Sequence, residues 1–158
     1  QRAFLEINSD VVAVGSAVEM IDERGNSIGV RRYPRSEAEV KRYFAFRSPM
    51  AHPSVMFRTE TIKSVGGYPE FRKAQDYALW GTLLSRGYKI SNLNAVLTKL
   101  RIGSSFEARR GLDHLKCEIQ VIKFLRANCQ LGFFSFVLSL AMRIVLRTYN
   151  EIRSLTRG

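Results

Sequence analysis

The sequence is poor in cysteine, with only Cys117 and Cys129 among its 158 residues. The two do not form a Cys-x-x-Cys pair or any other spacing typical of a metal site, which excludes a cysteine-based zinc centre. Both fall in segments with a helical pattern. We therefore expect them to be buried thiols in a protein of a reducing compartment.

Long apolar runs are also lacking. The most apolar segment is 131–146, but its uncharged part extends only from about Gln130 to Met142 before Arg143 interrupts it. Because a helix needs about 20 apolar residues to cross a bilayer, the pattern argues against a spanning helix. Two alternatives stay open: a helix lying in the surface of an anionic membrane, or one that packs in a core or dimer contact.

Acidic side chains are few, 14 against 25 Lys and Arg, so the net charge is +11. Residues 1–98 carry 14 basic and 10 acidic side chains, whereas residues 99–158 carry 11 and 4. A partner of the second part is therefore expected to be anionic: nucleic acid, a phosphorylated ligand or a membrane surface. The basic residues are dispersed and no aromatic-rich single-strand signature is present, so we do not expect nucleic acid.

What the chain does contain is enough apolar residues for a core. They make up 46% of its 158 residues, and 158 residues is the length of one domain. Residues 11–21 predict a buried strand, "DERGN" a turn, and "SIGVRRY" a second strand that completes a hairpin. Asp22 and Glu23 at its tip are expected to be solvated turn residues rather than metal ligands. The 36–46 segment predicts a helix with a capping box of Ser36 and Glu39.

Further along, "SVMFR" predicts a short strand, "TETIKSV" a helical turn, and "YKISNLNAVLTKLRI" one or two short strands broken near Asn92 to Asn94. Residues 112–128 predict an amphipathic helix with Leu115, Ile119, Ile122 and Leu125 on one face. Hairpin, helix, strand, helix and strand in this order indicate an α/β or α+β domain.

The segment "KAQDYALWGTLLSRGYKISNL" predicts a helix with one apolar stripe, ended by Gly87. Asp76 falls in its first turn, where exposed amide groups and the helix dipole favour a carboxylate. This accounts for the acid without any function. The alternative, a catalytic role, depends on a wider pattern.

That pattern consists of four segments in order, "DVVAVGSAVEMIDERGN", "AHPSVMFRTETIKSVGGYPEF", "AQDYALWGTLLSRGYKISNL" and "TKLRIGSSFEARRG". Their succession resembles the second half of a family 2 glycosyltransferase with the GT-A fold. The last is similar to bacterial transferases that build exopolysaccharide and lipopolysaccharide. The resemblance implies an α/β fold with a mixed sheet for residues 1–111, the acceptor-side half, followed by C-terminal amphipathic helices in 112–158, a basic segment that associates with membrane or packs against protein.

The resemblance also implies roles for particular residues. "QDYALW" is similar to the family's Glu-Asp-x-x-Leu-Trp segment, whose second acid is the general base, and this assigns the role to Asp76. Gln75 replaces the first acid and remains a candidate substrate contact. His52, in "AHPSVMF", is a candidate acceptor contact or a structural group. Trp80 is a candidate for stacking on an acceptor sugar or for core packing.

Arginine forks match the oxygens of a diphosphate, so Arg101, Arg109 and Arg110 are candidate phosphate-binding residues, with a solvated basic face as the alternative. The resemblance implies that the nucleotide-binding half precedes Gln1 and holds a divalent cation, Mn or Mg. No metal ligand is expected within the sequence itself.

The implied function is an inverting transfer of a sugar from a nucleotide-sugar donor to a glycan acceptor, lipid-linked and at the cytoplasmic face of a bacterial inner membrane. The alternatives are an inactive membrane-peripheral scaffold and a basic binding module.

Overall fold

The computed structural model describes residues 1–103, 112–128, 132, 136–138, 140–142 and 144–145. Its described elements are, in chain order, α1 (Arg2–Ile7), β1 (Val11–Ile21), β2 (Ser27–Arg31), α2 (Glu37–Phe44), η1 (His52–Ser54), β3 (Met56–Phe57), α3 (Thr59–Ser64), α4 (Gln75–Ser85), β4 (Lys89–Arg101) and α6 (Leu112–Asn128). The predicted α/β class is confirmed, and so is the helix over residues 112–128.

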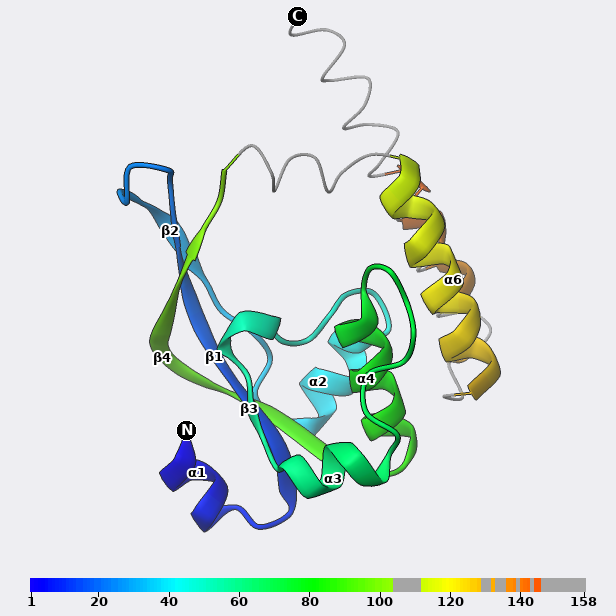
Figure 1. Cartoon of the computed structure of the whole chain (residues 1–158), viewed down its shortest axis with the longest axis horizontal. Helices are drawn as coiled ribbons and strands as arrows, with labels where there is room; N and C mark the ends of the chain where they lie inside the picture. The colour runs from blue at the N-terminus through cyan, green and yellow to red at the C-terminus, as the bar shows by residue number, and fades with distance from the viewer. Residues whose placement is uncertain (104–111, 129–131, 133–135, 139, 143, 146–158) are drawn as a thin grey trace, which may run out of the picture.

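β1 is the centre of a mixed sheet (Figure 1). On one side β4 runs parallel to it along its whole length. On the other side β2 pairs antiparallel with its second half and β3 antiparallel with its first half. The first eight residues of β1 are buried because both faces of this part of the sheet are covered: Val12 and Ala13 belong to the main core, and Val11 and Val14 pack with Leu5 of α1. Burial on both faces explains the continuous apolar run.

The predicted hairpin is confirmed, and its turn uses Asp22 as a structural group. The Asp22 carboxylate accepts hydrogen bonds from the backbone and side-chain nitrogens of Asn26 at 2.8 and 3.0 Å. These bonds hold the pKa of Asp22 below its ordinary value. The side-chain oxygens of Asp22 are thereby engaged inside the turn.

β4 corrects one expectation. The sequence predicted one or two short strands broken near Asn92 to Asn94, but the structure has a single strand of 13 residues. At the predicted break the strand continues, but its pairing register with β1 shifts: Leu93 is opposite Ser16, and Val96 is opposite the next residue, Ala17. Extra residues in one strand produce a bulge, which bends the strand without ending it.

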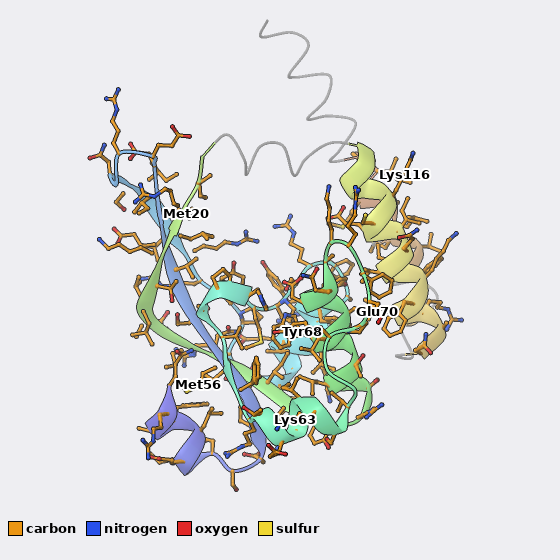
Figure 2. The ribbon with its side chains drawn as sticks, in the orientation of Figure 1. Met20, Met56, Lys63, Tyr68, Glu70 and Lys116 are labelled. Atoms are coloured by element: carbon orange, nitrogen blue, oxygen red, sulfur yellow. The ribbon has the colours of Figure 1, made fainter. Side chains whose placement is uncertain are left out.

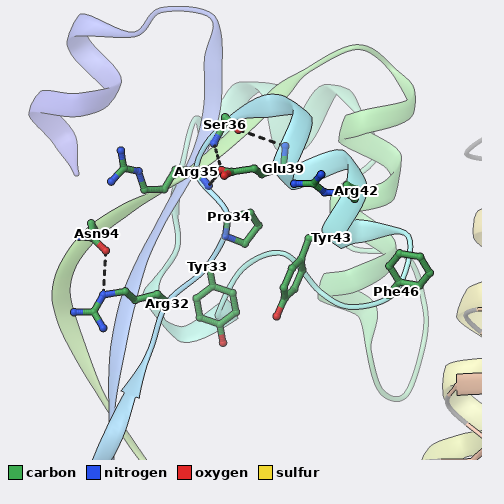
Figure 3. Close-up of a pocket in the computed structure, with 10 residues that line it drawn as sticks. All are labelled: Arg32, Tyr33, Pro34, Arg35, Ser36, Glu39, Arg42, Tyr43, Phe46 and Asn94. Carbon is green, nitrogen blue, oxygen red and sulfur yellow. Dashed lines mark hydrogen bonds between the residues drawn. The ribbon is translucent and has the colours of Figure 1, made fainter.

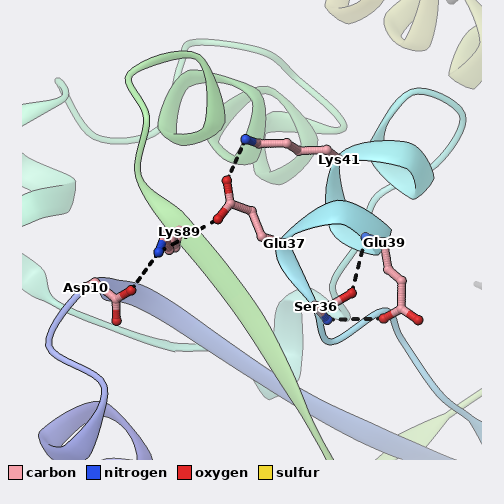
Figure 4. Close-up of polar contacts among 6 residues, drawn as sticks. All are labelled: Asp10, Ser36, Glu37, Glu39, Lys41 and Lys89. Atoms are coloured by element: carbon pink, nitrogen blue, oxygen red, sulfur yellow. Dashed lines mark hydrogen bonds and ion pairs between the residues drawn. The ribbon is translucent and has the colours of Figure 1, made fainter.

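α2 begins as predicted, with both hydrogen bonds of the Ser36 and Glu39 capping box. Figure 4 shows this box beside a chain of charges at the start of the sheet. Lys89 Nζ lies 2.9 Å from Asp10 Oδ2 and 3.8 Å from Glu37 Oε2. All these groups are solvent-exposed, so they contribute little individually.

α4 is buried on more sides than the single predicted stripe. Tyr77 to Gly81 and Leu83 are all buried, because α6 covers a further face of this helix (Figure 1). The contact is close: a Cβ on Gly81 would lie 2.1 Å from Leu125 Cδ2. Ile122 and Leu125 are fully buried there as predicted, and Ile119 is half-buried.

Leu115 and Cys129 lie where the structure does not describe the side chain, whereas Cys117 is a buried free thiol, as predicted. The division at residue 111 stays a prediction. Among the described residues, no helix is both long and apolar enough to cross a membrane.

Candidate active site

Asp76 lies at the head of α4, and the backbone before it is unusual. Ala74 adopts the left-handed region at φ 61° and ψ 23°, the only described residue other than glycine with a positive φ. This conformation costs an alanine about 1 kcal/mol or more, and such strain concentrates at functional sites. The turn places Gln75 and Asp76 in the first turn of the helix, as predicted, where free amide groups favour a carboxylate.

The Asp76 side chain lines a cleft of about 750 Å³, called here the Asp76 cleft. Its walls come from the second half of β1, the end of β2, the segment from Arg47 to Pro53, the start of α4 and the end of β4. Glu118 of α6 also contributes. The cleft therefore gathers residues that are far apart in the sequence around Asp76.

No hydrogen bond or ion pair within the described part of the chain occupies the Asp76 carboxylate. The side chain is partly exposed. A carboxylate that is open to solvent and to a cleft is able to accept a proton from a bound hydroxyl group.

Basic side chains surround this acid. Arg31 comes from the end of β2, Arg47 from the segment after α2, and Arg72 and Lys73 from the segment before α4. Together with Asp76 and Glu118, the titratable lining of the Asp76 cleft is predominantly positive. Guanidinium groups suit phosphate oxygens, so the cleft favours an anionic ligand.

His52 and Gln75 both line the Asp76 cleft, so the structure brings three of the candidate residues together. His52 is exposed at the start of η1, and its ring meets that of Tyr68 edge-on with centroids 5.6 Å apart (Figure 2 labels Tyr68). This contact leaves the His52 ring open to solvent.

Trp80 is placed differently. Its side chain is fully buried in the core, and its ring lies 6.3 Å from that of His52. This placement matches core packing, the alternative to sugar stacking, because a ring without exposed surface offers no face to a ligand. Trp80 instead packs in the core next to the ring of His52.

The phosphate candidates do not gather here either. Leu100 and Ile102 line the Asp76 cleft, and since side chains alternate along a strand, Arg101 between them projects to the opposite face. Its Nη1 donates to the carbonyl oxygens of Asp22 and Glu23 at 2.9 and 2.8 Å. Arg101 thus stabilises the hairpin turn, and Arg109 and Arg110 lie outside the described residues.

The negative charge of Asp76 contributes to a raised pKa at two nearby tyrosines. Burial raises the pKa of Tyr68 above its ordinary value, and the negative charge of Asp76 adds to the effect. Burial also raises the pKa of Tyr33; Arg31 opposes this, while Tyr43 and Asp76 reinforce it. The Arg31 guanidinium lies 5.2 Å from the centre of the Tyr33 ring, a cation–π contact.

Asn92 holds two walls of the site together. It is buried on β4, and its Nδ2 donates to the carbonyl oxygens of Pro34 and Pro49 at 2.7 and 3.0 Å. Gly15 on β1 is opposite, where a Cβ would lie 2.3 Å from Asn92 Oδ1. Gly15 therefore leaves space for the Asn92 side chain, which hydrogen-bonds the segments that contain Pro34 and Pro49.

Sequence reasoning missed the four basic residues of the cleft. A signal existed for Arg31, because "RRYPR" at residues 31–35 combines basic, aromatic and turn residues after a strand. Arg72 and Lys73 immediately precede the Asp76 helix. Arg47 carries no such pattern and is recognised only from its position in the fold.

The described residues contain no group of three His, Cys, Asp or Glu side chains that could hold a metal ion. The Asp76 cleft has only Asp76 and Glu118 as carboxylates among four basic side chains, a donor set that does not fit a divalent cation by itself.

Comparison with known proteins gives no match to a family model. Curated relatives do match. The amylovoran biosynthesis glycosyltransferase AmsE of Erwinia amylovora is 32% identical over 148 residues, 93% of this chain and 55% of the relative. The UDP-Gal:alpha-D-GlcNAc-diphosphoundecaprenol beta-1,3-galactosyltransferase of Escherichia coli is 32% identical over 91% of this chain and 53% of its own length. The O-antigen biosynthesis glycosyltransferase WbnJ of Escherichia coli is 26% identical over 82% and 52%.

The chain spans about half the length of the curated relatives it matches. Over most of its own length it is a relative of glycosyltransferases of bacterial exopolysaccharide and O-antigen biosynthesis, which confirms the resemblance to transferases that build bacterial surface polysaccharides.

Proposed function

We propose that the chain forms the acceptor-side part of an inverting, family 2 glycosyltransferase of the GT-A fold, with Asp76 as the general base. The observation that carries this proposal is the position of Asp76 at a strained helix start, where its carboxylate opens into a predominantly basic cleft and has no hydrogen bond or ion pair to another described residue. The relationship to polysaccharide glycosyltransferases supports it.

In this mechanism an acceptor hydroxyl lies against the Asp76 carboxylate. The carboxylate takes the hydroxyl proton while the oxygen attacks the anomeric carbon of the donor sugar from the face opposite the nucleotide. The bond from that carbon to the diphosphate oxygen breaks, and the nucleoside diphosphate leaves with the electron pair. One displacement of this kind inverts the configuration of the anomeric carbon.

Basic residues of the Asp76 cleft have a role in the same step. Arg31, Arg47, Arg72 and Lys73 would attract the anionic substrates and offset negative charge as the diphosphate departs. Gln75 and His52 would hydrogen-bond the acceptor. A divalent cation, Mn or Mg, would neutralise diphosphate charge when bound, and we assign it chiefly to the family's nucleotide-binding half because the described cleft does not fit it.

The acceptor is proposed to be lipid-linked, with the enzyme peripheral at the cytoplasmic face of the bacterial inner membrane. One of the relatives is named for a diphosphoundecaprenol acceptor. In addition, four described apolar side chains near the C-terminus are 44–65% exposed: Val137, Leu138, Ile144 and Val145. Exposed apolar groups within a basic segment suit the surface of an anionic membrane.

The proposal is tested by incubating the full-length protein with a panel of UDP-, GDP- and dTDP-sugars, manganese or magnesium, and lipid-linked acceptors. Nucleotide release with one donor class, and a product whose anomeric configuration is inverted by NMR, are expected. Retained configuration would contradict the single displacement. Absence of release with every donor and acceptor would favour an inactive scaffold or a basic binding module.

A further inference from the structure

A second pocket of about 760 Å³ adjoins the Asp76 cleft, since Tyr33 lines both, and Figure 3 shows the residues that line it. It is bounded by the 32–36 segment, by α2 and by Asn94 of β4. We call it the arginine pocket. Neither the sequence pattern nor the reaction at Asp76 accounts for it.

Three guanidinium groups line the arginine pocket, those of Arg32, Arg35 and Arg42, and all three side chains are exposed. Its one acid, Glu39, is already engaged, since it accepts hydrogen bonds from the backbone nitrogens of Ser36 and Arg35 at 3.1 and 3.3 Å. These contacts hold the pKa of Glu39 below its ordinary value, so it stays a capping group. The lining therefore carries a net positive charge.

Aromatic rings form the rest of the lining: Tyr33, Tyr43 and Phe46, all partly buried. In Figure 3 the rings of Tyr33 and Tyr43 project to the same side of the chain. Rings held in this way offer apolar faces and hydroxyl groups together, which suits a sugar ring that has both kinds of surface. A free phosphate ion would make no use of these faces.

Tyr33 joins the two pockets, because it lines both the arginine pocket and the Asp76 cleft. A ligand with one unit against Asp76 can therefore place its next unit in the arginine pocket. Arg32 is oriented at this edge by the bond from its Nε to Asn94 Oδ1, 3.1 Å long.

We propose that the arginine pocket is a subsite for an acidic sugar of the acceptor glycan, one that carries a carboxylate. This inference rests on the proposed function for its acceptor. The planar carboxylate pairs with a guanidinium fork of Arg35 or Arg42, while the sugar ring lies against Tyr33 and Tyr43. The subsite then selects acceptors by charge at a unit that does not react.

The test is a binding titration followed by amide NMR shifts, with a glucuronic acid–glucose disaccharide as the probe. Cellobiose, the same disaccharide without the carboxylate, is the matched neutral ligand. The acidic disaccharide is expected to shift the amides of the 32–46 segment and to bind about tenfold more tightly than cellobiose, since a charge-assisted pair is worth about that factor.

The variant Arg35→Gln/Arg42→Gln should lose this tenfold preference. Its control is Arg24→Gln/Arg126→Gln, which removes the same charge at exposed positions of the hairpin tip and of α6 and should leave the preference intact. Equal binding of the two disaccharides, loss of preference in the control, or no shift in the 32–46 segment would overturn the proposal. Sodium phosphate that produces the same shifts as the disaccharide would overturn it too, by showing a general anion site.

The outcome is independent of turnover. No donor sugar is present in the titration, so binding at the arginine pocket is measured without any transfer at Asp76. If the protein transfers sugar but fails this titration, the acidic subsite is wrong and the proposed function stands. If the titration succeeds without transfer, the pocket stands as a glycan-binding site and the proposed reaction is wrong.

Discussion

Replacing Gly81 with alanine should weaken the packing of α6 on α4. The added Cβ would lie 2.1 Å from Leu125 Cδ2 and 2.9 Å from Phe44 Cζ, so it is pressed from two sides by buried groups. Overpacking of this kind costs about 1–3 kcal/mol. Alanine is favoured over glycine inside a helix by about 1 kcal/mol. The expected net loss in the free energy of unfolding is therefore about 0–2 kcal/mol.

The partner change is Leu125→Ala, which leaves a cavity and should cost about 2–5 kcal/mol by itself. In the double variant the new methyl group on residue 81 occupies part of that cavity. The two changes should therefore be less destabilising together than their sum, by about 1–2 kcal/mol. Urea unfolding of the four proteins measures this difference. A stabilising Gly81→Ala change, together with strict additivity, would refute the α4–α6 contact.

Two other predictions concern the frame around the site. Asn92→Ala should cost about 1–3 kcal/mol in urea unfolding, because the carbonyl oxygens of Pro34 and Pro49 lose their donor; a change near zero would contradict the fastening role. The second concerns acid. Lys89 holds the pKa of Asp10 below its ordinary value of 3.8, so this pair stabilises the fold above that value and loses its effect as the pH falls through the lower, folded-state pKa. Comparison of Lys89→Met with the unchanged chain at pH 7 and pH 2 should show a difference only at pH 7, and an equal difference at both pH values would contradict the pairing.

Much of the fold follows from local patterns. The β1–β2 hairpin, the capping box of α2 and the start of α4 at Gln75 each depend on residues close in the sequence, and the structure confirms them. The burial of α4 on several sides could not be predicted, because α6 is more than 25 residues away along the chain and packs through Gly81. A glycine within a helix gives no indication of which partner it admits.

The candidate site divides in the same way. Asp76 was found from a short motif, and its neighbour Gln75 came with it. The basic lining was missed because its members come from three separate segments that only the sheet brings together. Arg101 was also named as a phosphate candidate, and the structure places it away from the cleft: its neighbours Leu100 and Ile102 line the cleft, while Arg101 itself bonds to the hairpin turn.

The most direct measurement of the central claim compares nucleotide release by the full-length protein, its Asp76→Asn variant and its Glu70→Gln variant. Glu70 is an exposed acid six residues before Asp76 and outside the lining of the cleft, so it controls for loss of a carboxylate in the same segment. If Asp76 is the general base, the rate of nucleotide release should fall about 10²- to 10⁴-fold in Asp76→Asn, while that variant stays folded. The rate of Glu70→Gln should equal that of the unchanged protein. Equal rates for all three proteins would contradict the general-base assignment and leave Asp76 only the role of stabilising the first turn of α4.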